Sequence, residues 1–477
     1  MSSLQQTTPP LPILDEVLLK EMFNEAVARS GTVGAQLSIV KGNQQLNFAA
    51  GYANALLRIP MTADTLLQIG SITKLFNAMI VASLVDEDLL ELEAPLTAYL
   101  PELQIGDSGL GASITLGHLL SMTSGLDNGP YIYFGSGADA LARYVASCRS
   151  LLLHFLPGAH FGYSNAGICI AGHVAARAGK QSWEELLRDR ILRPAKLSQS
   201  ALLDADVENQ VIAAGHIIEE RDAGPTVVAP ELGSLRARGP SGPSLAMSMN
   251  NLARFGRIFL SGGLSDSGLS IVSKRAIEWM TVPRVSVPTR KYGDAWCAGP
   301  VTGDWNGVRV WGHGGTSPTA TSFLYWIPKL QGVVAFVLNT HAAMGAFSEY
   351  VFDAILKEAF GFSKPPIDVP DHQLPEANTD RYIGRYEDMG EALEVRSGDR
   401  GTLIAHWYSK HNPQERRRIR GIQSATLLPL GGDRFLVQPT NGVDRHRGKV
   451  DIAFFGTDDV GRTTNVLNLV FPMSRAQ

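Results

Sequence analysis

The sequence predicts an α+β fold, an α/β sandwich in which an antiparallel sheet is flanked by helices and followed by a small β barrel. Strand-like apolar runs occur at about residues 30–60 and again at 290–362. The stretch between them is mostly helical in pattern, with long loops. Beyond a Pro-containing linker at 363–377, short apolar runs alternate with Gly and Asp turns through 378–477. We therefore expect residues 1–362 to form one domain with an inserted helical subdomain, and 378–477 to form a lipocalin-like barrel or sandwich.

The first elements are expected to be a helix over residues 13–29 and two strands across 35–52 around a tight turn. A second helix is predicted over 71–86, because its apolar residues recur at intervals of three and four. They form one stripe, which predicts a single buried face: Ile72, Leu75, Phe76, Met79, Ile80 and Leu84.

Ser71 and Lys74 lie three positions apart at the start of this helix and therefore share one face. A serine hydroxyl becomes a good nucleophile when a base removes its proton. A lysine can be that base if burial or a nearby cation lowers its pKa from about 10.4. Gly70 permits a tight turn that leaves the Ser71 hydroxyl uncrowded. The pair is a candidate nucleophile and base.

The same S-x-x-K spacing occurs at Ser38 and Lys41, so the spacing alone does not identify a site. That second pair lies in a β-branched stretch typical of a strand, where residues three apart point to opposite faces. We therefore expect that Ser38 and Lys41 do not act together.

Tyr163 and Asn165 form a Y-x-N triplet that follows a Pro-Gly turn and precedes an apolar run, which predicts a loop entering a helix. A tyrosine there can share a proton with Lys74 and Ser71. Asn165 can hydrogen-bond Lys74 or a substrate amide. The triplet is therefore a second candidate component of one site.

A glycine-rich segment at 312–316 precedes two apolar runs, at 322–326 and 332–338. The runs predict a hairpin of strands, with the glycine-rich segment on the strand beside a pocket. A closing helix is expected over 346–360. The candidate pocket residues in the segment are His313, Gly314, Gly315 and Thr316.

The 477 residues carry a net charge of −4, without the basic excess expected of a nucleic-acid binder. No apolar run approaches the roughly 18 residues of a membrane helix, and the N-terminus lacks the basic start and apolar core of a secretory signal. Three cysteines are too few for a disulfide framework and favour a reducing compartment. We expect a cytoplasmic protein that binds neither nucleic acid nor membrane and uses no cofactor or metal. Its oligomeric state is left open.

In this order of motifs, S-x-x-K, Y-x-N and H-G-G, the chain resembles the superfamily of serine β-lactamases and penicillin-binding proteins. It is most similar to the class C β-lactamase-like branch of esterases, D-aminopeptidases and acyltransferases. The resemblance covers roughly residues 15–360 and includes the H-L-L-x-x-T-S-G-L pattern at 118–126. It implies a β-lactamase-like antiparallel sheet with flanking helices.

The resemblance implies that Ser71 is the nucleophile, that Lys74 and Tyr163 handle the proton, and that Asn165 is a polar support. It implies an oxyanion hole made by the backbone N–H groups of Ser71 and Thr316. His313 departs from the superfamily, in which a lysine of K-T-G normally binds the substrate carboxylate. This departure favours uncharged ester or amide substrates over penicillins.

We therefore expect a serine hydrolase that cleaves a small-molecule ester, or an amide or thioester, through an acyl-Ser71 intermediate. An alcohol or amine in place of water would make it an acyltransferase. A D-amino-acid amidase or peptidase is a further alternative, with an acidic group among Glu219, Glu220 and Asp222 to hold an α-ammonium. A catalytically silent ligand-binding scaffold is the non-enzyme alternative.

Overall fold

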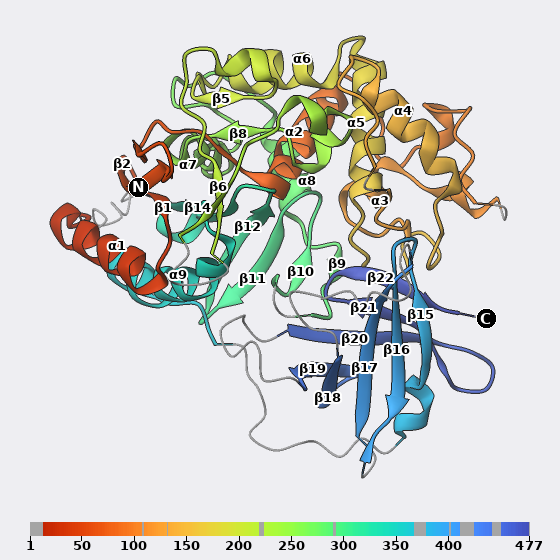
Figure 1. The fold of residues 1–477 in the computed structure, drawn as a ribbon. Coiled ribbons are helices and arrows are strands. Elements are labelled where there is room, and N and C mark those ends of the chain that lie inside the picture. The colour runs from red at the N-terminus through yellow and green to blue at the C-terminus, as the bar shows by residue number, and fades with distance from the viewer. Residues whose placement is uncertain are drawn as a thin grey trace, which may run out of the picture.

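The computed structural model describes residues 13–106, 109–130, 132–218, 224–289, 292–366, 378–399, 402–410, 424–440 and 450–476. Figure 1 shows a sheet covered by helices and, below it, a barrel of blue C-terminal strands. Most of the expected linker at 363–377 lies outside the described residues, which stop at 366 and resume at 378.

The main sheet has nine strands in the order β3-β2-β1-β14-β13-β12-β11-β10-β9, and neighbouring strands are antiparallel. The N-terminal hairpin pairs with β14, so that Ala35 lies opposite Leu338. The sheet is therefore assembled from both ends of the region, as predicted. Its strands are β1 (Gly34–Lys41), β2 (Gln44–Asn54), β3 (Ile59–Pro60), β9 (Val285–Ser286), β10 (Ala295–Trp296), β11 (Val301–Trp305), β12 (Val308–Thr316), β13 (Thr321–Ile327) and β14 (Gly332–Leu338).

Helices cover both faces of this sheet (Figure 1). The side chains of β14 alternate between the two faces. Val334 and Phe336 pack into a core with α1 (Glu16–Ser30) and the closing helix, whereas Val333 and Ala335 belong to the larger core around α2. All seven residues of β14 are buried as a result. The closing helix consists of α9 (Met344–Tyr350), a π-helical stretch (Val351–Ile355) and α10 (Leu356–Phe360).

The regular structure of the segment between the two halves of the sheet is mainly helical, and it also contains short strands that were not predicted. None of the helices in the described part of the chain has both the length and the apolarity that crossing a bilayer requires. The segment contains α2 (Thr73–Asp86), α3 (Leu116–Leu120), α4 (Ala140–Ser147), α5 (Asn165–Gly179), α6 (Trp183–Leu187), α7 (Met249–Leu260), α8 (Lys274–Thr281), β4 (Leu67–Gln68), β5 (Ser200–Ala201), β6 (Gly215–Ile217), β7 (Thr226–Val228) and β8 (Ala246–Met247).

Helix α2 lies at the centre of this region and differs from the prediction in two ways. It begins at Thr73 rather than Ser71, because Gly70 opens a short 3-10 turn. All of its residues from Thr73 to Leu84 are buried, not one stripe. The helix is surrounded because α5 and α8 pack along it, and Phe255 of α7 stacks on Phe76 with 3.6 Å between ring centroids.

The C-terminal strands close into a barrel, which decides between the barrel and the sandwich left open by the sequence. Its interior has a separate apolar core that includes Tyr386, Trp407 and Phe454. Ala453 and Leu467 instead join the large core of the helical region. The strands are β15 (Gly384–Glu387), β16 (Glu391–Ser397), β17 (Leu403–Ser409), β18 (Ser424–Gly431), β19 (Arg434–Pro439), β20 (Val450–Thr457), β21 (Thr463–Asn468) and β22 (Phe471–Arg475).

Replacing Phe76 by Ala should lower the free energy of unfolding by about 3–5 kcal/mol, because a fully buried ring stacked on Phe255 leaves a cavity. Urea denaturation followed by tryptophan fluorescence would measure the change. Phe76→Leu, which keeps most of the volume, should cost clearly less. A loss below about 1 kcal/mol for Phe76→Ala would contradict the packing described here.

Candidate active site

Gly70 brings two backbone segments together at the start of the site. Its φ of +56° is left-handed, and a Cβ at this position would lie 2.5 Å from the backbone nitrogen of Thr316. The turn it opens carries Ser71 beside the end of β12. A similar constraint holds at Gly315, where a Cβ would lie 1.9 Å from the carbonyl oxygen of Ile69. The close approach fits the expected oxyanion hole of Ser71 and Thr316, which remains a prediction.

The Ser71 hydroxyl lies between the two groups expected to move its proton. Lys74 Nζ is 2.9 Å from Ser71 Oγ, and the Tyr163 hydroxyl is 2.8 Å from the same atom. Lys74 Nζ also lies 4.8 Å from the centre of the Tyr163 ring. The structure thus brings together the three residues that the two sequence motifs predicted.

Lys74 is fully buried, and its nitrogen also donates to the backbone carbonyl of Ser241. Burial lowers the pKa of Lys74 to about 7; the Cys169 thiol opposes this shift, and the Arg238 guanidinium adds to it. A lysine with this pKa is partly unprotonated near neutral pH and can accept the Ser71 proton. The arrangement can therefore activate a serine for attack on a carbonyl carbon.

Tyr163 reaches the site from the loop before α5. The next residue, Ser164, caps the helix, because its Oγ accepts from the backbone N–H of Gly167 at 3.0 Å. The Tyr163 ring packs edge-on against Trp296, with ring centroids 5.6 Å apart. The Y-x-N triplet therefore lies on a loop entering a helix, as predicted.

Asn165 contacts the neighbouring loop through both its side chain and its backbone. Its side-chain Nδ2 donates to Asn128 Oδ1 at 2.9 Å, and its backbone N–H donates to the same oxygen at 3.0 Å. Asn165 is the first residue of α5, and this position directs its amide toward the loop that carries Asn128. These contacts fix the loop beside the site, and a contact of Asn165 with Lys74 or with a substrate amide stays a prediction.

His313 lies on β12 and is buried against Trp296, with ring centroids 5.3 Å apart. Its Nδ1 contacts the carbonyl oxygen of Gly314. Because a carbonyl only accepts, Nδ1 carries the hydrogen, and Nε2 presents a lone pair. Nε2 has no hydrogen-bond partner within the described ranges. Burial and then the nearby Lys74 charge lower the pKa of His313 to about 3, so the ring is neutral.

The competing S-x-x-K pair is separated, as expected. The Ser38 hydroxyl donates to Asn47 Oδ1 at 2.7 Å, while Lys41 Nζ donates to the carbonyl of Ala359 at 2.6 Å. The acidic residues considered for an α-ammonium, at 219–222, lie outside the described residues. Over the parts of the chain that are described, no group of three or more His, Cys, Asp or Glu side chains is arranged to hold a metal ion.

Two sets of contacts at the site have no sequence motif. The Ser241 carbonyl reaches Lys74 from 167 positions away. Asp127 and His154 form a buried pair beneath the Tyr163 loop, with 3.0 Å between Oδ2 and Nε2. Asp127 directly follows the H-L-L-x-x-T-S-G-L pattern, which indicates this region of the chain. No pattern in the sequence indicates its partner His154.

Comparisons with known proteins point to one family. The family model for Beta-lactamase matches residues 19–354 of the chain. Penicillin-binding protein 4 of Amycolatopsis lactamdurans is 28% identical over 381 residues, which are 79% of this chain and 99% of that protein.

Solved structures extend the likeness to the whole fold. A crystal structure of SurE aligns with a TM-score of 0.78 at 22% identity and covers 97% of this chain and 99% of its own. A structure of SurE with D-Leu gives a TM-score of 0.75. The D-amino acid amidase from Ochrobactrum anthropi SV3 aligns with a TM-score of 0.60 at 22% identity, over 71% of this chain and 97% of its own. At these identities the likeness shows a shared fold.

The rate at which p-nitrophenyl acetate acylates Ser71 should rise with pH through an apparent pKa of about 7. The reason is that only unprotonated Lys74 accepts the Ser71 proton, and it is mostly protonated below this pH. The burst of p-nitrophenol, followed by stopped flow on both sides of neutrality, would measure the rate. Lys74→Arg should stay charged and lose the burst. A wild-type rate that does not change with pH would contradict this role.

Proposed function

Because this chain belongs to the Beta-lactamase family, matched over residues 19–354, we propose that it is a serine hydrolase that cleaves a small ester, or a related amide or thioester. The reaction passes through an acyl intermediate on Ser71. The observation that carries the proposal is the position of Ser71 Oγ, within 2.9 Å of Lys74 Nζ and 2.8 Å of the Tyr163 hydroxyl.

In the acylation step, neutral Lys74 takes the Ser71 proton as Oγ attacks the carbonyl carbon. The oxygen of that carbonyl becomes negative and accepts hydrogen bonds from the backbone N–H groups of Ser71 and Thr316. The bond to the leaving group then breaks, and Tyr163 delivers a proton to it. Tyr163 recovers a proton from Lys74, which leaves acyl-Ser71.

In the second step, water attacks the acyl carbon and the same groups run in reverse. Its proton passes through Tyr163 and Lys74 back to Ser71 Oγ, and the acid is released. An alcohol or amine that occupies the water position would receive the acyl group instead. We propose hydrolysis, and acyl transfer to an alcohol or amine is the alternative that follows from the same intermediate.

His313 supports a preference for acyl groups without a carboxylate. Its ring is neutral at physiological pH, and its Nε2 offers a hydrogen-bond acceptor rather than a positive charge. A carboxylate at this position would be repelled or left without a donor. A neutral group, or one that donates a hydrogen bond, would be accepted.

The acceptor at His313 also favours a second candidate, a D-amino-acid amidase. An α-ammonium or amide N–H can donate to Nε2. Structures of a D-amino acid amidase and of SurE with D-Leu share the fold. Turnover of D-alanine amide without turnover of L-alanine amide would favour this candidate over the esterase.

The first test follows p-nitrophenol release from p-nitrophenyl acetate and butyrate by the wild type and by Ser71→Ala. We expect turnover in the wild type and a loss of at least about 10³-fold in the variant, because no other group supplies the nucleophile. Intact-protein mass spectra should show an acyl adduct on the wild type. Turnover that survives in Ser71→Ala would overturn the proposal, and a silent binding protein would show neither turnover nor adduct.

Replacing His313 by Lys should increase the rate at which benzylpenicillin acylates Ser71 by about tenfold or more, because a cation would then face the substrate carboxylate. Mass spectrometry of the penicilloyl adduct over time would give the rate. His313→Gln, which stays neutral, should show no gain. Equal rates for the lysine and glutamine variants would contradict the proposed role of this position.

A further inference from the structure

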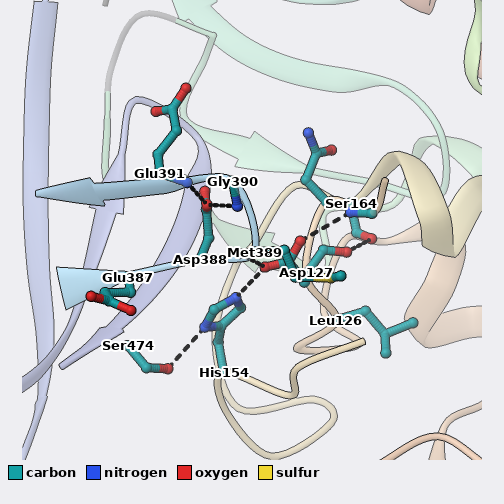
Figure 2. A network of polar contacts seen from close by, with 12 residues as sticks. Leu126, Asp127, His154, Ser164, Glu387, Asp388, Met389, Gly390, Glu391 and Ser474 are labelled. Atoms are coloured by element: carbon teal, nitrogen blue, oxygen red, sulfur yellow. Dashed lines mark hydrogen bonds and ion pairs between the residues drawn. The ribbon is translucent and has the colours of Figure 1, made fainter. Parts of the chain in front are cut away.

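Asp127 lies where the Tyr163 loop meets the barrel, and it is 2% exposed. Its side chain accepts from three N–H groups at 3.0 Å each: His154 Nε2 and the backbone nitrogens of Gly129 and Met389. Met389 belongs to the turn between β15 and β16, so this carboxylate joins the helical region to the barrel. Figure 2 shows the network at this junction.

The backbone of Asp127 is bound to the loop that carries Tyr163. Its carbonyl oxygen accepts from the Ser164 hydroxyl at 2.7 Å. The same hydroxyl accepts from Gly167 and thereby caps α5. One residue thus contacts the barrel through its side chain and the start of the catalytic loop through its carbonyl.

The barrel also contacts Tyr163 directly. The backbone N–H of Tyr163 donates to the carbonyl of Val470 at 2.9 Å, and the Phe471 ring packs edge-on against the Tyr163 ring with centroids 5.6 Å apart. Both residues belong to the β21–β22 turn and its end. The backbone and the ring of a catalytic residue are therefore held by the barrel.

His154 completes the connection from the other side. Its Nδ1 lies 2.8 Å from the Ser474 hydroxyl on β22, and its carbonyl accepts from Asn465 Nδ2 at 2.9 Å. Asp127, His154 and Ser474 are the residue types of a catalytic triad. The His154 side chain is fully buried, however, so the chain of contacts holds two parts of the protein together rather than facing a substrate.

The charge of Asp127 is maintained in this dry position by its donors. Burial alone would raise its pKa, but the hydrogen bonds from His154, Gly129 and Met389 together lower the pKa below its usual value. The neighbouring Asp388 shows the opposite result: burial, and then the charge of Asp127, raise its pKa. Removing one donor or acceptor would leave buried polar groups unpaired.

We propose that Asp127 is a positioning residue that fixes Tyr163 by tying its loop to the barrel, so that the barrel is part of the catalytic apparatus. The inference rests on the proposed function, in which Tyr163 delivers a proton to the leaving group. If Tyr163 were less firmly held, proton transfer to the leaving group would be the step most impaired. Losing this proton transfer matters most for a leaving group that is unstable as an anion, such as an alkoxide, and least for p-nitrophenolate.

The test measures kcat/KM for an ethyl ester and for the p-nitrophenyl ester of the same acid, with Asp127→Asn in the full chain. The Asn side chain has an NH₂ group in place of one carboxylate oxygen. This donor would then face another N–H donor at the junction, and one hydrogen bond would be lost. We expect the ethyl ester to lose at least about tenfold more than the p-nitrophenyl ester. Ser164→Ala, which removes the bond to the Asp127 carbonyl, should show the same unequal loss and is the second variant if Asp127→Asn does not fold.

Matched controls come from contacts made elsewhere. Asp206→Asn alters a carboxylate that accepts from Arg188 and from backbone nitrogens, and Ser182→Ala removes the N-cap of α6. Both should reduce the melting temperature without changing the ratio of the two rates. Equal losses for both esters in Asp127→Asn and Ser164→Ala would overturn the inference while leaving the hydrolase intact. Absence of Ser71-dependent turnover of either ester in the wild type would overturn the proposed function, and the inference with it.

Discussion

Lys74 carries an amine into the interior of the protein, and most of the site depends on this burial. Burial lowers the pKa of this amine to about 7, and the two oxygens that contact its nitrogen, the Ser71 hydroxyl and the Ser241 carbonyl, are both neutral. Lys74 is enclosed because α2 is buried along its length from Thr73 to Leu84. Helices α5, α7 and α8 provide that cover for α2.

The same burial also determines the protonation state of His313. Two positive charges in one dry pocket would repel strongly, and His313 loses its proton under the combined effect of burial and the Lys74 charge. With Nδ1 bound to the Gly314 carbonyl, the ring keeps one buried acceptor, Nε2, without a partner among the described residues. The burial that lowers the pKa of Lys74 to about 7 therefore also keeps the His313 ring neutral.

The parts of this structure that were predictable depend on short stretches of sequence. The spacing of Ser71 and Lys74, the loop of Tyr163 and the two halves of the sheet each have a local pattern. The Ser241 carbonyl contacts Lys74 from 167 positions away, and the Met389 N–H contacts Asp127 from 262 positions away. Every residue has a backbone carbonyl, so the residue type at these positions does not indicate the contact. The contact between Asn165 and Asn128 was not predicted, because Asn128 lies on a separate loop. The tautomer of His313 depends on a backbone oxygen in the same way.

The edges of the nine-stranded sheet and of the barrel bear on whether copies of the protein associate at high concentration. The barrel is closed, and the nine-stranded sheet terminates in strands of two residues, β3 with its Pro60 on one side and β9 on the other. Short strands and proline offer few free backbone groups to a strand from another molecule. The longer β2 pairs with β3 only at Tyr52 and Asn54. The wholly apolar β14 lies in the interior of the sheet, paired on both sides. Strand β14, the most apolar strand of the sheet, therefore has no free edge with which to pair with a strand of another copy.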